Sequence, residues 1–403
     1  MSFSLLKIGV AKSGSEEWNS IDMSISTGWV KIAAMRNTFR ICLLAVLILA
    51  FTGAASAQAK ADQRTAAEQQ FAALGDLALK NGKVIKDFRL GYRTLGTLDA
   101  QKSNALLFPT WLGGQTKDLL QFASPGNWLD TNKYFVVLID AIGDGISTSP
   151  SNSHSQPLME FPEFSIRDMV EAEHRFATEV LRLSHVHAVV GISMGGMQSF
   201  EWAVMYPDFM DDVVPIVGSP QSTSYDKLLW TLEIEAIELD PAWNGGKPSG
   251  PITKGFELAE EISDMNVTSP AQHVRTTNPN DFQAMMAKID KQAPSSPGTA
   301  ADFIRQRQAI NGLDIPGELG ETLEQAAAGV RAKMLIVSSP EDHMVNATPA
   351  IAFANSIGAP VVLLDSPCGH LSPSCISVGP VVAKFLADPT SVKSQTLQET
   401  PAK

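Results

Sequence analysis

The stretch VVGISMGGMQSFEWA, residues 189–203, places Ser193 between two glycines at a change of hydrophobic period. Residues 187–192 are mostly apolar and β-branched, as in a strand, whereas residues 194–205 carry apolar side chains at helical spacing. Glycine on both sides of a serine permits the sharp strand-to-helix turn that exposes a hydroxyl. The stretch therefore predicts a nucleophile elbow, with a purely structural turn as the alternative.

Apolar segments alternate with helical patterns along most of the chain. Several of these segments lack two-residue alternation, as expected for strands covered on both faces. Strand–helix–strand units of this kind predict an α/β fold with a mostly parallel central sheet and helices on both faces. Asn81-Gly82 is a hairpin signal, so we expect an antiparallel pair from Leu77–Lys80 and Lys83–Leu95. Further strands are expected at Ala105–Pro109, Tyr134–Asp140, His187–Ile192, Val213–Gly218, Lys333–Ser338 and Pro360–Asp365, and core helices at Arg167–Leu183 and Met194–Tyr206.

One long interval departs from this alternation. Residues 221–327 combine helical patterns with Pro- and Gly-rich loops, which predicts a helical cap inserted between two parts of the core, 58–220 and 328–388. The polar residues 389–403 are expected to form a flexible tail. Cap helices are expected at Asp226–Leu239, Gly255–Met265, Asp281–Lys291 and Ala300–Asn311.

The first 57 residues have the composition of a secretory signal. A basic stretch, Met35–Arg40, leads into the apolar run Ile41–Thr52, and small residues follow. This order predicts a signal peptide cleaved after Ala57, preceded by an upstream extension. The apolar run is too short to span a bilayer comfortably, so we expect a periplasmic or secreted protein without membrane attachment after cleavage. Translation starts either at Met1 or at the beginning of the basic stretch.

Beyond residue 57 the chain is acidic. The sequence has 31 Lys and Arg against 43 Asp and Glu. Residues 1–57 contain five of the basic residues and three of the acidic ones. The remaining 26 basic and 40 acidic residues give a formal net charge of −14. An acidic protein repels nucleic acid and anionic membranes, so we expect a small-molecule substrate and neither of those partners.

Two cysteines, Cys368 and Cys375, follow the predicted signal. An oxidising compartment favours a disulfide between them, and two separate buried thiols are the alternative, because spacing does not give the Cα separation. The sequence contains no HExxH motif, clustered Cys and His ligands or phosphate loop. We therefore expect neither a metal nor a cofactor.

A serine nucleophile needs a base, and the base needs an acid to orient it. After an elbow of this kind the chain order is serine, acid, histidine. Four of the seven histidines precede Ser193, His273 falls in the cap, and His343 follows its strand too closely to leave room for an acid. His370, beside Gly369 on a loop after the last apolar segment, is therefore the predicted base, with a surface histidine as the alternative.

The acid is expected just beyond the predicted strand Lys333–Ser338. Asp342 is the predicted residue because its position agrees with the required chain order, and Glu341 and Asp365 are the alternatives. Asp365 lies closer to the histidine in sequence, but it ends a strand, where an aspartate often caps a turn.

An oxyanion hole needs amide donors close to the serine. Met194 follows Ser193 at a helix N-terminus and supplies the first donor. The loop after Ala105–Pro109 contains Trp111-Leu112-Gly113-Gly114, whose glycines let the backbone approach the serine. We therefore predict an oxyanion hole made by the amides of Leu112 and Met194.

These motifs resemble those of homoserine O-acetyltransferases, a branch of the α/β-hydrolases. The nucleophile region GISMGGMQSFEWAVMYPD is similar to theirs, and the resemblance covers most of residues 75–385. Further blocks match in order and spacing: FRLGYRTLGTLDAQKSNALLFPTWLGG, LDTNKYFVVLIDAIGDGISTSPS, LDPAWNGG and SPCGHLSP. The resemblance implies an α/β-hydrolase fold, a homodimer formed through the cap, and the same triad and oxyanion hole: Ser193, Asp342 and His370, with Leu112 and Met194.

The resemblance also implies an arginine at the cap entry that binds the homoserine carboxylate. The chain has no arginine between Arg182 and Arg275, and Lys227 would be a less specific substitute. An exported enzyme would also meet little acetyl-CoA. We therefore predict a serine hydrolase that cleaves a small acyl ester through an acyl-enzyme on Ser193. The alternatives are an O-acyltransferase that uses acetyl-CoA, and a non-catalytic binding protein on a hydrolase scaffold.

N-terminal sequencing of the exported protein tests the predicted signal. We expect Gln58 as the first residue, because signal cleavage follows small side chains such as Ala57. An exported chain that still contains Arg40 would contradict the assignment.

Overall fold

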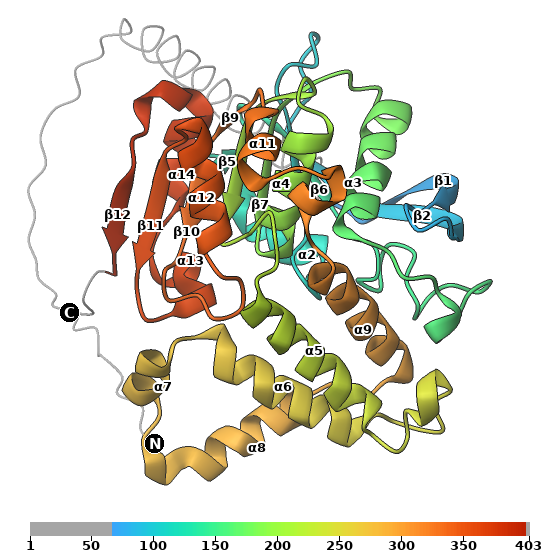
Figure 1. Ribbon diagram of the computed structural model, residues 1–403. Helices are drawn as coiled ribbons and strands as arrows, with labels where there is room; N and C mark the ends of the chain where they lie inside the picture. Colours follow the sequence, from blue (N-terminus) through green and yellow to red (C-terminus); the bar gives the residue numbers. More distant parts are fainter. Residues whose placement is uncertain (1–66, 400–403) are drawn as a thin grey trace, which may run out of the picture. The chain divides into compact units, whose positions relative to one another are not determined.

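The computed structural model describes residues 67–399 (Figure 1), and the predicted signal at 1–57 lies outside them. The described residues form a ten-stranded sheet in the order β1-β2-β6-β3-β7-β8-β10-β11-β12, with β9 paired to β8. The β1–β2 and β2–β6 pairs are antiparallel, and the other pairs of this sheet are parallel. The strands are β1 (Gln70–Ala78), β2 (Val84–Leu95), β3 (Ala105–Pro109), β6 (Phe135–Ile139), β7 (Val186–Ile192), β8 (Met210–Ile216), β9 (Lys333–Met334), β10 (Ile336–Ser338), β11 (Val361–Asp365) and β12 (Gln395–Gln398), and a separate pair is formed by β4 (Ala123–Ser124) and β5 (Leu129–Asp130).

The predicted antiparallel pair around Asn81-Gly82 is confirmed. Its first strand begins at Gln70, earlier than the predicted Leu77. The register shifts on both sides of Gly75, and this irregularity breaks the alternation by which a strand is recognised in sequence.

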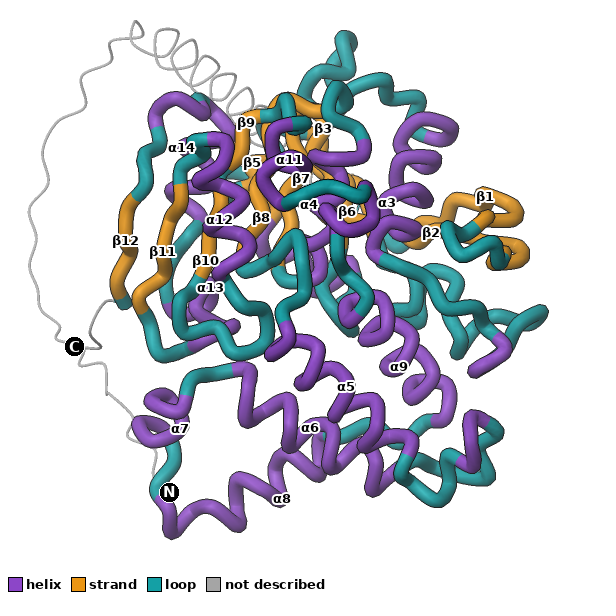
Figure 2. The backbone as a smooth tube through the Cα atoms, viewed as in Figure 1, coloured by secondary structure: helices purple, strands orange, loops and turns teal. Residues whose placement is uncertain are grey.

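Side chains of the central strands enter two separate apolar cores. On β3, Leu106 and Phe108 belong to one core and Leu107 to the other. Burial on both faces explains why these segments are apolar without alternation, and it confirms the predicted α/β-hydrolase architecture. Figure 2 shows the strands side by side among the helices. Helices α3 (Ile166–Arg175), α4 (Met194–Met205) and α12 (Thr348–Ile357) pack on one face, and α14 (Gly379–Ala387) on the other.

The interval between β8 and β9 forms the cap. Four of its helices correspond to the predicted ones, and three further helices, at Pro270–Thr276, Ile315–Leu319 and Leu323–Ala328, were not predicted. The cap has its own apolar core, which includes Trp243, Phe256 and Phe303. No helix among residues 67–399 combines the length and the hydropathy that a membrane span needs. The cap helices are α5 (Ser224–Glu238), α6 (Thr253–Val267), α7 (Pro270–Thr276), α8 (Phe282–Gln292) and α9 (Pro297–Asn311), which lie together in the lower part of Figure 1, and the short helices α10 (Ile315–Leu319) and α11 (Leu323–Ala328) follow.

The C-terminal segment differs from the prediction of a flexible tail at 389–403. Residues Gln395–Gln398 form β12, which pairs in parallel with β11. A strand at the edge of a sheet is held by backbone hydrogen bonds, so polar side chains are compatible with it. Leu397 alone of the four packs against the core. Residues 400–403 lie outside the described part of the chain.

The junction of β7 and α4 has the geometry of the predicted elbow. Ser193 adopts φ 57° and ψ −122°, a region that residues other than glycine rarely occupy. The backbone around it is crowded: a Cβ on Gly191 would lie 1.9 Å from the Gly195 carbonyl oxygen, and one on Gly195 would lie 2.5 Å from that of Pro109. The Ser193 amide donates to the Ile216 carbonyl over 2.9 Å. The two glycines are therefore required by this turn.

Substitution of Gly191 tests the crowding. We expect Gly191→Ala to lower the free energy of unfolding by about 3 kcal/mol or more, because its Cβ would overlap backbone that cannot move without disturbing the elbow. Gly250→Ala is the control: no atom lies within 4 Å of its Cβ position, and the change should stay within about 0.5 kcal/mol. Denaturant unfolding measures both, and equal stabilities would contradict the role of the turn.

A buried carboxyl group joins α3 and α4. Glu173 on α3 is 1% exposed, and its Oε2 accepts a hydrogen bond from Trp202 Nε1 over 2.6 Å. Burial raises the pKa of Glu173 to about 8, although the hydrogen bond from Trp202 opposes the shift. Glu173 is therefore mostly protonated in the folded protein at neutral pH.

This proton makes stability depend on pH. The pKa of Glu173 is about 8 in the folded chain against an ordinary 4.5, so between these values the folded state holds a proton that the unfolded chain has lost. The free energy of unfolding should therefore fall as pH rises through this range, and Glu173→Gln should flatten the slope. Denaturant titrations across the range measure it, with Glu179→Gln, a 56% exposed side chain, as the control. An unchanged slope in Glu173→Gln would show that the carboxyl is ionised throughout.

Candidate active site

Three side chains meet at the carboxyl ends of parallel strands in the central sheet. Ser193 follows β7, Asp342 follows β10 and His370 follows β11. Ser193 Oγ lies 2.8 Å from His370 Nε2, and His370 Nδ1 lies 2.7 Å from Asp342 Oδ2. The structure thus brings together the three residues predicted as a triad, with the imidazole hydrogen-bonded between the hydroxyl and the carboxylate.

The Asp342 carboxylate is buried and held by backbone. Its side chain is 1% exposed, and its Oδ1 accepts hydrogen bonds of 2.9 Å from the amides of Met344 and Val345. These bonds leave Oδ2 to face the histidine. The two alternative acids, Glu341 and Asp365, are both exposed, and no hydrogen bond joins either to the histidine within residues 67–399.

The histidine loop is closed by a disulfide. Cys368 and Cys375 are bonded in the structure, so of the two arrangements that spacing left open, the paired one is present. The Oγ atoms of Ser372 and Ser339 lie 3.1 Å apart and join this loop to the acid loop. Both connections restrict the backbone that carries His370.

The oxyanion loop is held by the cap. The Gly113 amide donates to Gln306 Oε1 of α9 over 2.9 Å, and Gln306 Nε2 donates to the Ile142 carbonyl over 3.1 Å. Within residues 67–399, the amides of Leu112 and Met194 donate to no other group. Both predicted donors therefore remain available to a ligand oxygen.

A cavity of about 740 Å³ reaches Ser193 and His370 and is lined by both core and cap. Aromatic and aliphatic side chains predominate in its wall, as in sites that bind small organic ligands. Its aromatic residues are Trp111, Phe122, Trp128, Trp230 and Phe303, and its aliphatic ones include Leu112, Ile192, Val267, Met344 and Leu371.

The same wall contains a buried arginine. Arg307 on α9 is 7% exposed, and its Nε donates to Glu233 Oε2 on α5. Glu260 of α6 also lines the cavity. Burial lowers the pKa of Arg307, and Glu233 opposes that shift. Burial likewise raises the pKa of Glu260, although Arg307 acts to lower it. The wall of this cavity therefore contains a cation and one carboxyl group, and the carboxylate that pairs with the cation is buried behind it.

Arg307 was not among the predicted site residues. The resemblance implies a cation at the cap entry, with Lys227 as a less specific substitute, but Lys227 is exposed and does not line the cavity. A usable signal was the four-residue spacing of Phe303 and Arg307, which places both on one face of the predicted helix Ala300–Asn311.

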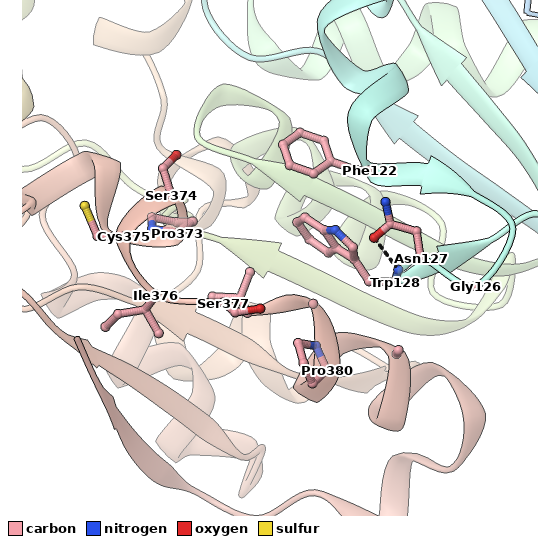
Figure 3. Close-up of a pocket in the computed structure, with 13 residues that line it drawn as sticks. Phe122, Gly126, Asn127, Trp128, Pro373, Ser374, Cys375, Ile376, Ser377 and Pro380 are labelled. Atoms are coloured by element: carbon pink, nitrogen blue, oxygen red, sulfur yellow. Dashed lines mark hydrogen bonds between the residues drawn. The ribbon is translucent and has the colours of Figure 1, made fainter. Parts of the chain in front are cut away.

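A second cavity, of about 630 Å³, adjoins the first. Figure 3 shows the rings of Phe122 and Trp128 on one side of it and the segment from Pro373 to Pro380 on the other. Cys375 belongs to that segment, so the disulfide-closed loop forms part of its wall. Four residues line both cavities, namely Phe122, Trp128, Pro373 and Ser374.

The arrangement has the parts that acyl transfer requires. A hydroxyl is paired with an imidazole, the imidazole with a carboxylate, and free amides lie beside them. Among the described residues, no group of three His, Cys, Asp or Glu side chains is placed to hold a metal ion.

Known proteins share this sequence pattern and fold. Residues 106–373 match the family described as the alpha/beta hydrolase fold. An ethyl acetate hydrolase from Pseudomonas veronii is 31% identical, over 74% of this chain and 88% of its own length. A probable esterase from Corynebacterium glutamicum is 39% identical over 48% of this chain, and the match spans only 54% of that protein.

Acetyltransferases and a solved esterase structure are also similar. A homoserine O-acetyltransferase from Methanococcoides burtonii is 29% identical, over 67% of this chain and 62% of its own length. The structure of the acetyl esterase MekB superposes with a TM-score of 0.73 at 26% identity, covering 81% of this chain and 99% of MekB. The chain therefore belongs to the α/β-hydrolase fold family and, within it, to the branch that resembles the homoserine O-acetyltransferases.

Proposed function

We propose that this protein is an exported serine hydrolase that cleaves small acyl esters. The observation that carries the proposal is the unbroken hydrogen-bond chain from Ser193 Oγ through His370 to Asp342, beside a cavity that core and cap line together. Similarity to an ethyl acetate hydrolase and to an acetyl esterase supports a short acyl group. The composition of residues 1–57 supports export.

The first half of the reaction forms the acyl-enzyme. Ser193 Oγ attacks the ester carbonyl carbon while His370 Nε2 accepts its proton. The carbonyl oxygen becomes an oxyanion, which the amides of Leu112 and Met194 stabilise, each donor contributing about 3 kcal/mol. Asp342 stabilises the imidazolium and keeps its ring oriented. The intermediate then expels the alcohol, whose oxygen takes the proton from His370.

The second half releases the acid. Water enters as the alcohol leaves, and His370 Nε2 removes a proton from it as its oxygen attacks the acyl carbon. The second tetrahedral intermediate uses the same oxyanion donors. Ser193 leaves as an alkoxide that takes the proton back from His370, and the carboxylic acid departs.

Acyl transfer to an alcohol is the second candidate. Similarity to homoserine O-acetyltransferases favours it, as does the buried Arg307 in the cavity wall. The guanidinium is already paired with Glu233, however, so it offers a carboxylate acceptor no uncompensated positive charge. Hydrolysis is therefore the function that the site supports better.

Two assays on residues 58–403 test the proposal. We expect hydrolysis of p-nitrophenyl acetate and covalent labelling by a fluorophosphonate. Ser193→Ala should abolish labelling and lower the turnover rate by about 10⁴-fold or more, because the nucleophile is lost. Ser155→Ala, an exposed serine on a loop, is the control and should behave as the wild type.

A parallel incubation with acetyl-CoA and homoserine separates the two candidates. We expect acetyl-CoA to yield no more O-acetylhomoserine than the Ser193→Ala protein gives. Rapid O-acetylhomoserine formation would place transfer ahead of hydrolysis. Absence of both labelling and turnover would instead indicate a binding protein on a hydrolase scaffold.

A further inference from the structure

The cation in the cavity wall is held by three cap helices. Arg307 Nε on α9 donates to one oxygen of Glu233 on α5. The other oxygen of Glu233 accepts a hydrogen bond from Ser263 Oγ on α6 over 2.5 Å. The Glu233 side chain is fully buried and that of Arg307 is 8% exposed. Both carboxylate oxygens are thus occupied, and the guanidinium is fixed at its Nε edge.

The outer part of the guanidinium is not used by the protein. Within residues 67–399, neither Nη atom of Arg307 donates a hydrogen bond. The ring of Phe303, one turn earlier on α9, lies against one face of the guanidinium. A guanidinium carries four N–H donors on its two Nη atoms. Because Arg307 lines the same cavity as Ser193, these donors are available to a ligand in that cavity.

The charges around the arginine decide which acceptor suits it. Glu233 balances the charge of Arg307, and Glu260 in the same wall adds a second carboxyl group. A carboxylate on the ligand would lose its hydration and meet no net positive charge. An uncharged oxygen loses far less hydration and still gains a hydrogen bond from a charged donor, which is stronger than one between neutral groups.

We propose that Arg307 binds an uncharged oxygen in the alcohol part of the substrate, so that the enzyme selects esters of ether, hydroxyl or carbonyl-bearing alcohols and rejects those that bear a carboxylate. The inference rests on the proposed esterase function. It assigns the oxygen to the alcohol part because the proposed acyl group is too short to carry one. Arg307 thereby becomes a specificity-determining residue that takes no part in bond breaking.

Matched acetate esters test this selection. Butyl acetate and 2-methoxyethyl acetate differ by the exchange of one methylene for an ether oxygen, and the methyl ester of 3-acetoxypropionate replaces the charge of the free carboxylate with a methyl group. For the wild type we expect kcat/KM to favour the methoxyethyl ester over butyl acetate by about tenfold, which corresponds to about 1.4 kcal/mol. The methyl ester should exceed the free carboxylate by at least about the same factor.

Variants assign the selection to the arginine. In Arg307→Met the preference for the ether oxygen should fall to about unity. Because this change leaves Glu233 buried without its partner, Arg307→Met combined with Glu233→Gln provides a second protein with the same expectation. Glu233→Gln alone leaves the positive charge of Arg307 unbalanced. It should therefore raise kcat/KM for 3-acetoxypropionate relative to that for its methyl ester. Each ratio is taken within one protein, so a loss of folded enzyme cancels.

Arg305→Met is the control. Arg305 is 6% exposed on the same helix, bonds to Glu163 and to the Met159 carbonyl, and does not line the cavity. In Arg305→Met, the preference for the ether oxygen and the preference for the methyl ester over the carboxylate should both stay at their wild-type values. The inference is overturned if the ether preference survives in both Arg307 variants, or if the wild type prefers the carboxylate. Failure to hydrolyse butyl acetate and p-nitrophenyl acetate alike would instead overturn the esterase function itself, and the inference with it.

Discussion

The direct backbone contacts around Ser193 are the constraint on which the rest of the site depends. At the start of α4, Gly195 lies directly against Gly191 of β7 and Pro109 of β3. The next residue, Gly196, lies against Gly218 just after β8, and no side chain separates any of these backbones. Contacts of this kind cannot relax by a change of rotamer, so the backbone of Ser193 has one position relative to the sheet. Since the acid and histidine loops leave the same edge, strand register largely sets the catalytic distances.

The cap supports the candidate active site as well as covering it. It forms one hydrogen bond to each of the three loops that surround the serine. Gln306 accepts from the Gly113 amide of the oxyanion loop, Asp226 accepts from the Asn346 amide of the acid loop, and the Ser269 amide donates to the Pro367 carbonyl of the histidine loop. Changes in the cap that alter substrate choice are therefore expected to act on catalysis as well, because the same helices carry both.

Local sequence signals account for the parts of this site that could be foreseen. Ser193 was predictable because the change from strand to helix period and the flanking glycines fall within 15 residues. His370 followed from the small number of histidines and the order of the triad. Asp342 was harder, since Glu341 precedes it in the same loop and Asp365 ends β11, and burial against the histidine distinguishes it from both.

Other features depend on partners that are distant in sequence or carry no side-chain signal. Strand β12 is held by backbone pairing with β11, and the polar side chains of β12 give no sequence signal for this pairing. The pairing of Arg307 with Glu233 joins residues 74 positions apart. The four-residue spacing of Phe303 and Arg307 places both on one face of α9, but only the packing of that helix shows that this face lines the cavity.

The sequence by itself determined the fold class, the position of the serine and its histidine, and the existence of a cap, because short-range periodicity and glycine placement encode them. Tertiary structure alone decided which acid meets the histidine, that the two cysteines are bonded, and that the cavity holds a neutralised cation. These depend on how separate helices and loops pack, since burial and charge pairing are properties of the assembled neighbourhood and not of any one segment.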